Sequence, residues 1–241
     1  MNMRNKSRNK SVDTSLNLAG KEYMNNIEQA RFNMIEQQIR PWGVLNLDIL
    51  DLLKVVKREE YVPPALRELA FFDMEIPLGH DESMLTPKME ARILQELSIK
   101  KTDNVLEVGT GSGYLTALLA TLAKYVYSVD IVAELSTQAG AKLIAHNIQN
   151  VSLQTGNAAS GWAQHAPYDV IILTGSVPFL PDEFRQQMAI GGRLFAVVGD
   201  SPAMHAQRIT RVSAAQWLSQ DLFETDIKPL RHAVQPERFV F

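Results

Sequence analysis

The stretch that decides the fold is Asn104-Val105-Leu106-Glu107-Val108-Gly109-Thr110-Gly111-Ser112-Gly113-Tyr114. Its first half is short and rich in β-branched residues, as expected for a parallel strand buried on both faces. Leucines then recur at helical spacing, at Leu115, Leu118, Leu119 and Leu122. The glycines therefore lie on a strand-to-helix corner, where glycine tolerates positive φ and the helix start offers unpaired N–H donors. This pattern predicts a turn that binds a cofactor.

The residues around the glycines separate three classes of cofactor. A phosphate loop requires Lys followed by Ser or Thr after its last glycine, but Gly113 is followed by Tyr114 and Leu115. A dinucleotide site spaces its glycines G-x-G-x-x-G, whereas these run G-x-G-x-G, and the carboxylate of Glu107 would repel a pyrophosphate. S-adenosylmethionine carries an ammonium and a sulfonium group and no phosphate, so Glu107 would attract it directly or through water. The sequence therefore favours S-adenosylmethionine as the cofactor.

A second acid completes the predicted cofactor site. Asp130 ends the apolar run 125–130, about 20 residues beyond the first glycine, where such folds place the acid that accepts the ribose hydroxyls. Asn157 follows a later strand, at a position from which it could hydrogen-bond an adenine edge. The predicted cofactor-binding residues are Glu107, Gly109, Thr110, Gly111, Ser112, Gly113, Asp130, Ile131, Asn157 and Ala158.

Composition limits the classes of protein that this chain can belong to. Its 241 residues, 46% of them hydrophobic, are enough to bury one large core. The net charge of −3 gives no general attraction to nucleic acid or to an anionic membrane, so we expect neither as a partner. There is no cysteine, which excludes disulfides and thiolate catalysis and suits a cytoplasmic location. No apolar run approaches the roughly 18 residues of a membrane helix.

We expect one domain built from three segments. Residues 1–23 are polar and basic, which predicts a disordered tail, and they lack the apolar region of a secretory signal. A nucleic-acid-binding arm is the alternative for this tail. Met24 is an alternative start of the protein, because patterned sequence begins directly after it. Residues 24–100 are predicted to form helices and an active-site loop, and residues 101–241 the cofactor-binding core.

Two helices are predicted before the first strand. Apolar residues fall on one helical face from Ile27, and Pro41 ends that pattern. Asn46 is positioned to cap the second helix. Its expected buried side consists of Leu47, Leu50, Leu53 and Val56 or its neighbour. We expect these helices to lie across the sheet edge or over the mouth of the cofactor site.

A loop is predicted over residues 73–87, followed by a clear helix start. Thr86 has the character of an N-cap and Pro87 that of a first helical residue. The helix is expected to bury Ile93, Leu94 and Leu97. A loop at this place could close over a ligand held at the glycines.

Strands and helices alternate after Asp130, which is typical of a parallel sheet. Gly191-Gly192 is expected to end the last helix of this series. The C-terminal residues alternate between apolar and polar positions, as antiparallel strands at a sheet edge do. The predicted elements are a helix over 133–147, strands over 151–154 and 168–174, a helix over 181–188, and strands over 193–198, 207–212 and 217–227.

Other motifs favour different chemistry only weakly. Gly199-Asp200-Ser201 resembles the start of a lipase nucleophile motif, but Pro202 follows it and no histidine has a supporting pattern. The five histidines show no metal-ligand spacing, so we predict no metal site.

Several motifs in a fixed order resemble the protein-L-isoaspartate O-methyltransferase family over residues 61–230. Besides the glycine stretch they are Glu60-Tyr61-Val62-Pro63, Pro77-Leu78-Gly79, Val126-Tyr127-Ser128-Val129, Gly161-Trp162, Ala166-Pro167-Tyr168-Asp169, Gly191-Gly192-Arg193-Leu194 and Pro229-Leu230. The resemblance implies a class I methyltransferase fold, which is Rossmann-like. Its seven-stranded sheet is mostly parallel, with an antiparallel C-terminal edge. The resemblance also implies S-adenosylmethionine as the cofactor and isoaspartyl residues of damaged proteins or peptides as the substrate.

The chain departs from the family pattern in the predicted loop. Where the family has Gly-Gln-Thr-Ile-Ser-Gln-Pro, this chain has Asp81-Glu82-Ser83-Met84-Leu85-Thr86-Pro87, so the active-site serine of the family falls on Leu85. Leucine cannot donate a hydrogen bond to a carboxylate. Ser83 and Thr86 are the nearest hydroxyls and become the catalytic candidates. The aspartate on the adenine side of the family site falls on Asn157, which can still hydrogen-bond.

Three functions remain open from the sequence. The first is O-methylation of isoaspartyl residues, for which no general base is needed because a carboxylate with a pKa near 4 is already ionised at neutral pH. The second is methylation of another acceptor on the same scaffold. The third is a cofactor-binding protein with weakened catalysis. Either a monomer or a dimer is compatible with the sequence.

Overall fold

A seven-stranded sheet in the order β5-β4-β3-β6-β7-β8-β9 organises this computed structural model, which describes residues 24–236. Strands β5, β4, β3, β6 and β7 are parallel, and β8 and β9 are antiparallel. The bounds are β3 (Asn104–Val108), β4 (Tyr125–Asp130), β5 (Val151–Thr155), β6 (Tyr168–Leu173), β7 (Met188–Asp200), β8 (Ala203–Ser213) and β9 (Gln216–Thr225). The predicted mostly parallel sheet with an antiparallel C-terminal edge is therefore confirmed. The tail predicted over residues 1–23 lies outside the described residues.

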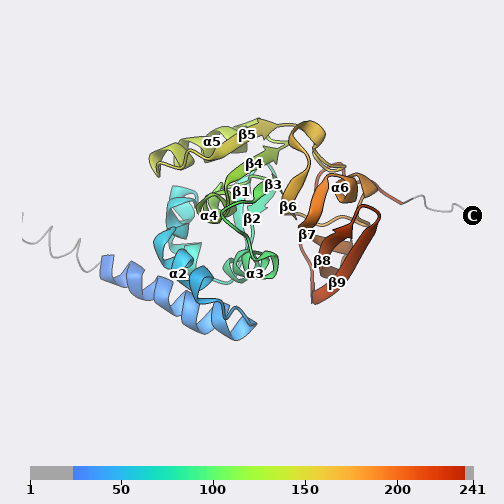
Figure 1. The fold of residues 1–241 in the computed structure, drawn as a ribbon. Helices are drawn as coiled ribbons and strands as arrows, with labels where there is room; N and C mark the ends of the chain where they lie inside the picture. The colour runs from blue at the N-terminus through green and yellow to red at the C-terminus, as the bar shows by residue number, and fades with distance from the viewer. Residues whose placement is uncertain (1–23, 237–241) are drawn as a thin grey trace, which may run out of the picture.

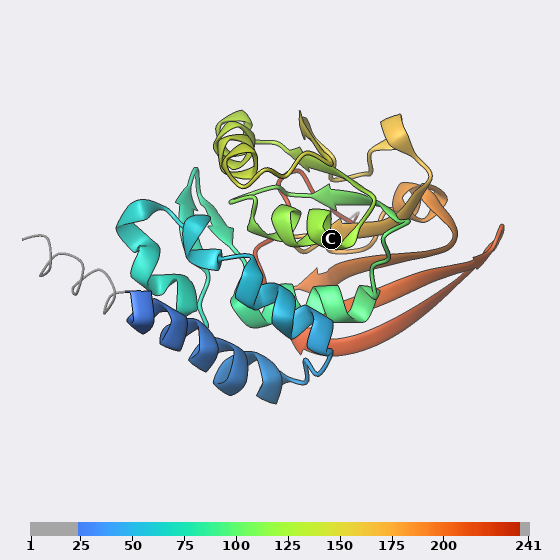
Figure 2. The same cartoon turned by 60° about the vertical axis from the view of Figure 1, so that its left-hand side comes forward.

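Helices flank this sheet, and in Figure 1 the N-terminal helices lie at the lower left and β7, β8 and β9 at the right, while Trp42 of the N-terminal segment contacts Phe223 of β9. Figure 2 shows β8 and β9 as a long curved hairpin. The α-helices are one over residues 24–33, α2 (Leu47–Val55), α3 (Pro87–Leu97), α4 (Tyr114–Leu122), α5 (Ala133–Ala145) and α6 (Asp182–Gln186). Short turns of other helix types are η1 (Met34–Ile39), η2 (Arg40–Trp42), η3 (Arg58–Glu60), η4 (Pro64–Phe71) and η5 (Ala163–His165). None of the helices in the described part of the chain has the length and hydropathy to cross a membrane.

Alternating residues of β3 enter two different hydrophobic clusters. Val105 packs on one face with residues of α3, α4 and the N-terminal segment, whereas Leu106 and Val108 pack on the other face with Phe184 of α6. This alternation follows from the two-residue period of a strand, and both faces are covered because the neighbouring strands are parallel. Glu107 shares the face of Val105, so its carboxyl is carried into the interior.

The N-terminal helices follow the prediction with one exception. The side chain of Asn46 accepts hydrogen bonds from the backbone N–H groups of Asp48 and Ile49 and so caps α2. Leu50 and Leu53 are buried as expected. Leu47 was expected on the same buried side but is 64% exposed, because the buried stripe of α2 runs through Ile49, Leu50, Leu52 and Leu53.

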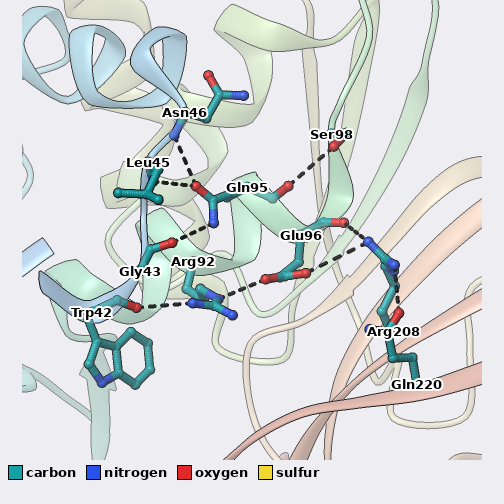
Figure 3. A network of polar contacts seen from close by, with 10 residues as sticks. All are labelled: Trp42, Gly43, Leu45, Asn46, Arg92, Gln95, Glu96, Ser98, Arg208 and Gln220. Atoms are coloured by element: carbon teal, nitrogen blue, oxygen red, sulfur yellow. Dashed lines mark hydrogen bonds and ion pairs between the residues drawn. The ribbon is translucent and has the colours of Figure 1, made fainter. Parts of the chain in front are cut away.

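Helix α3 ties the N-terminal segment to the antiparallel edge of the sheet (Figure 3). The Gln95 side chain donates to the Gly43 carbonyl at 2.8 Å and accepts from the Leu45 N–H at 2.7 Å. At the next residue of the helix, Arg208 of β8 donates to the Glu96 carbonyl at 3.0 Å. The N-terminal segment and the sheet therefore share one polar network and one hydrophobic cluster.

Two local predictions are wrong. Residues 73–87 are not a plain loop, because they contain the antiparallel hairpin of β1 (Ile76–Gly79) and β2 (Glu82–Met84). Gly191-Gly192 does not end a helix, because α6 ends at Gln186 and both glycines lie inside β7. The physical reason is a shift in the β6–β7 register, where Gly191 adopts φ +81° and a Cβ on Gly192 would lie 2.8 Å from the Ala189 carbonyl oxygen.

Candidate cofactor and active site

The glycine turn lies where β3 ends and α4 begins. Gly109 has φ +99°, and a Cβ there would lie 2.1 Å from Oγ1 of Thr174 on the neighbouring chain segment. Gly113 has φ +83°, and a Cβ there would lie 2.9 Å from the Cβ of Ala139 in α5. At both positions the positive φ would strain any other residue, and its Cβ would clash with the neighbouring side chain. Gly113 therefore serves the packing of the turn against α5.

Asp130 fastens the glycine turn from the end of β4. Its Oδ2 accepts from the Gly111 N–H at 2.8 Å, and its Oδ1 accepts from the Val132 N–H at 2.8 Å. The carboxylate is 6% exposed and lines the cavity described below. Each oxygen retains lone-pair capacity for a further donor. Asp130 can thus orient the turn and still accept hydroxyl donors from a ligand.

Glu107 is a fully buried carboxyl at the same corner. Its Oε2 accepts from Thr116 at 2.5 Å and from Ser128 at 2.6 Å, whereas its Oε1 is buried without a hydrogen-bond partner in the described structure. Burial raises the pKa of Glu107 to about 8, although the bonds from Ser128 and Thr116 lower it and the nearby Asp130 raises it. An unpartnered buried carboxyl oxygen is costly unless a donor or cation reaches it. The ammonium or sulfonium of S-adenosylmethionine fits this requirement.

One cavity, partly open to solvent, brings most of the predicted site together. The predicted residues that line the cavity are Ser83, Glu107, Gly109, Thr110, Gly111, Ser112, Asp130, Ile131, Asn157 and Ala158. Gly113 and Thr86 do not line it. The hairpin roofs the glycine turn, because Leu78 Cδ1 would lie 3.4 Å from a Cβ on Gly111.

Asn157 makes a local turn at the cavity wall after β5. Its Oδ1 accepts from the Ala159 N–H at 3.0 Å, in an arrangement that fixes the side chain. The side-chain amide group keeps donors for a ligand. This geometry is compatible with the predicted contact to an adenine edge.

The two predicted catalytic hydroxyls occupy different environments. The Ser83 hydroxyl lies at the cavity and donates to the carboxylate of Glu75. Thr86 instead accepts from the Met89 N–H at 3.4 Å and caps α3, as the helix-start pattern predicts. The structure therefore brings Ser83, but not Thr86, to the cavity.

Leu85 lines the cavity and is held by a buried ion pair behind it. Arg58 is 1% exposed, and it donates to the Leu85 carbonyl at 2.6 Å and to the Ala70 carbonyl at 3.0 Å. The same guanidinium pairs with the buried carboxylate of Glu90. The backbone between β2 and α3 is thus fixed from inside, whatever side chain stands at position 85.

Sequence reasoning missed the part of the wall that comes from the C-terminal tail. Lys228 and Arg231 line the cavity, together with Thr174 at the end of β6 and Glu75 before β1. Lys228 and Arg231 flank Pro229-Leu230. This dipeptide was the only motif in the sequence that drew attention to this C-terminal segment. The described residues contain no group of three or more His, Cys, Asp or Glu that could hold a metal ion.

Comparison with known proteins gives a consistent result. A family described as protein-L-isoaspartate(D-aspartate) O-methyltransferase matches residues 29–232. A protein-L-isoaspartate O-methyltransferase 1 of Rhodopseudomonas palustris is 36% identical over 201 residues, which are 83% of this chain and 82% of that protein. A protein-L-isoaspartate O-methyltransferase of Syntrophus aciditrophicus is 36% identical over 190 residues, or 79% of this chain and 87% of that protein.

Solved structures show the same fold. One is a Plasmodium falciparum chain described as a protein-L-isoaspartate O-methyltransferase in complex with S-adenosyl-L-homocysteine. It matches with a TM-score of 0.71 at 20% identity, over 83% of this chain and 97% of that one. Another protein-L-isoaspartate O-methyltransferase matches with a TM-score of 0.70 at 21% identity, over 83% of this chain and 65% of that one.

Proposed function

Because the chain belongs to the protein-L-isoaspartate(D-aspartate) O-methyltransferase family, we propose that it transfers a methyl group to isoaspartyl carboxylates of damaged proteins or peptides. The methyl donor is S-adenosylmethionine. The observation that carries the proposal is that Glu107 and Asp130 meet the glycine turn in one cavity, with the β1–β2 hairpin over it. The same cavity extends to Ser83 and Leu85, where an acceptor can approach.

In this reaction the residues of the chain bind the cofactor and the acceptor and hold them in position. S-adenosylmethionine supplies a methyl group that is already activated by a sulfonium. Glu107 offers its unpartnered oxygen to the positive charge, and Asp130 and Asn157 offer hydrogen bonds to the sugar and base. The acceptor carboxylate needs no general base, since it is ionised at neutral pH. Catalysis then depends on orientation and on excluding water, to which the roofing hairpin contributes.

A second function, methylation of a different acceptor, is favoured by the residue at position 85. Leu85 presents no hydrogen-bond donor to the cavity, and the nearby Ser83 hydroxyl is committed to Glu75. Losing one donor to a charged group costs about 1.5 to 3 kcal/mol, or roughly 10- to 150-fold in rate. An acceptor that carries no carboxylate would not depend on this donor.

The test compares two peptides that differ only in an L-isoaspartyl or an L-aspartyl linkage, each incubated with methyl-labelled S-adenosylmethionine. The proposal expects base-labile methyl groups on the isoaspartyl peptide alone, and a faster reaction in Leu85→Ser. Transfer to neither peptide, with the cofactor still bound, would contradict it and favour another acceptor or lost catalysis. Lys54→Ala, at an exposed ion pair with Asp51, is the matched surface control.

The proposal also covers the cellular location, the partners and the oligomeric state of the enzyme. A cysteine-free chain suits the cytoplasm, and damaged proteins or peptides there would be its partners. We propose a monomer or a dimer that acts without nucleic acid or membrane. Cell fractionation and light scattering test the location and the oligomeric state.

A further inference from the structure

Ion pairs join the β1–β2 hairpin to the C-terminal tail at the wall of the cavity. Lys228 Nζ lies 2.7 Å from Asp81 Oδ2, and Arg231 Nε lies 2.5 Å from Glu82 Oε1. Arg231 also donates to the carbonyl of His80, which is 151 residues away in the sequence. The two cations of the tail are therefore held by the two acids of the hairpin turn.

Both partners of this contact are anchored. On the hairpin, His80 Nε2 lies 2.9 Å from the Glu134 carboxylate of α5. On the tail, the Ser176 N–H donates to the Lys228 carbonyl and the Leu230 N–H donates to the Ser176 carbonyl, each at 2.9 Å. The side chains of Lys228 and Arg231 are thus presented at the cavity from a fixed backbone.

The charges of the cavity wall make these two cations exceptional. Among the described residues that line the cavity, Lys228 and Arg231 are the only Lys or Arg. Carboxylates are more frequent there, and Arg58 neutralises one of them, Glu90, from behind. The lining carboxyl groups are Glu75, Glu82, Glu90, Glu107 and Asp130. An anion that enters this cavity therefore finds a cationic side chain only at the tail, among the described lining residues.

Building on the proposed function, we infer that Lys228 and Arg231 bind the carboxylate of the acceptor, and that Asp81 and Glu82 are internal competitors for the same cations. The acceptor carboxylate takes the place of a hairpin carboxylate when it enters. Displacement is feasible because the Lys228 and Arg231 side chains are 36% and 38% exposed, so water can solvate the released acids. Lys228 lowers the pKa of Asp81, first through their hydrogen bond and then through its charge, so Asp81 competes as an anion at neutral pH.

This arrangement gives the chain a specificity that Leu85 alone would not provide. The family sequence carries Gly-Gln where this chain carries Asp81-Glu82, so the competing acids belong to the departure noted in the sequence. A guanidinium binds a carboxylate through two parallel N–H donors. Arg231 can therefore supply the recognition that the missing serine hydroxyl cannot.

The test measures equilibrium binding of a fluorescent isoaspartyl peptide and its α-carboxamide analogue, which lacks the negative charge, to the S-adenosylhomocysteine-loaded protein. We expect the wild type to prefer the carboxylate peptide. Arg231→Gln should weaken binding of that peptide about fivefold, about 1 kcal/mol, and leave the carboxamide peptide unchanged. Glu82→Gln should tighten binding of the carboxylate peptide alone. Lys54→Gln and Asp51→Asn are the matched controls, because they alter an exposed pair outside the cavity.

Three results would overturn the inference. The first is equal binding of both peptides, or of neither, by the wild type. The second is an equal effect of Arg231→Gln on both peptides. The third is weaker S-adenosylhomocysteine binding in Arg231→Gln without an effect on the peptides, which would assign the cations to the cofactor's own carboxylate. Thermal unfolding of each variant verifies that it remains folded.

The inference and the proposed function can fail separately. If the charge-dependent peptide preference is present but no methyl group is transferred, the carboxylate site is upheld and the methylation proposal fails. If the isoaspartyl peptide is methylated but Arg231→Gln leaves its KM unchanged, methylation is upheld and the carboxylate site is rejected.

Discussion

Glu107 shows how a single side chain can combine a place in the fold with a proposed binding role. The carboxyl is buried on the inner face of β3, and Thr116 and Ser128 satisfy only one of its oxygens. Its charge is therefore unfavourable until a cation arrives, and a cationic ligand should shift its proton equilibrium. Cofactor affinity and protein stability are both expected to depend on pH through this group.

The first prediction concerns stability of the cofactor-free protein against pH. The pKa of Glu107 is raised from 4.5 to about 8, so the folded state holds a proton between these values that the unfolded state has lost. The free energy of unfolding should therefore fall as pH rises from about 4.5 to 8, at up to about 1.4 kcal/mol per pH unit. Urea unfolding of the wild type and Glu107→Gln at several pH values measures this slope.

Glu107→Gln should have the shallower slope, because glutamine does not titrate. Part of the slope will remain, since burial also raises the pKa of Glu90 against the charge and hydrogen bond of Arg58. Equal slopes in the two proteins would show that Glu107 is ionised normally, and the electrostatic account of this corner would then be wrong.

At the scale of elements, the start of α3 combines the N-cap of Thr86, which the sequence predicts, with the buried contacts of Arg58, which it does not. Thr86 was identified from the sequence as both an N-cap and a catalytic candidate, and the structure shows the cap and places the residue outside the cavity. Arg58 was not singled out, because a lone arginine in a turn gives no sign that it is buried. Local patterns such as caps and strand periodicity could be predicted, whereas contacts between Arg58, Ala70 and Leu85 depend on tertiary structure.

We predict that Thr86→Ala costs about 1 kcal/mol of stability, the usual cost of losing an N-cap, and leaves kcat unchanged. Thermal or urea unfolding and a methyl-transfer assay measure the two quantities. Thr86→Ser should restore the stability. A large fall in kcat at unchanged stability would instead give Thr86 a catalytic role.

Removal of Arg58 should be far more damaging. Arg58→Met leaves the buried Glu90 carboxyl and two backbone carbonyls without their donor, and we expect a loss of about 3 to 5 kcal/mol. Urea unfolding measures the loss. Lys54→Met, which breaks an exposed pair, should cost no more than about 0.5 kcal/mol. Similar costs in both variants would contradict a structural role of the buried pair.

At the scale of the whole molecule, the parallel half of the sheet could be predicted and the closure of the cavity could not. The strand-to-helix corner at Gly109 and the acid at Asp130 follow from local sequence, and both lie where that pattern places them. The register shift at Gly191 and the contacts of Arg231 with the hairpin join distant segments, and no local pattern encodes them. The cavity residues around the glycine turn, and Ser83 on the hairpin, could therefore be predicted from the sequence, while Lys228 and Arg231 emerged only from the fold.

The central claim is that this cavity binds S-adenosylmethionine through Asp130 and Glu107, and calorimetric titration with S-adenosylmethionine tests it most directly. We expect one site per chain in the wild type, with affinity at least about tenfold lower in Asp130→Ala, which loses a carboxylate acceptor, about 1.4 kcal/mol. Below pH 8 the binding should release a proton, and Glu107→Gln should abolish that release. No binding by the folded wild type, or binding unaffected by Asp130→Ala, would contradict the account.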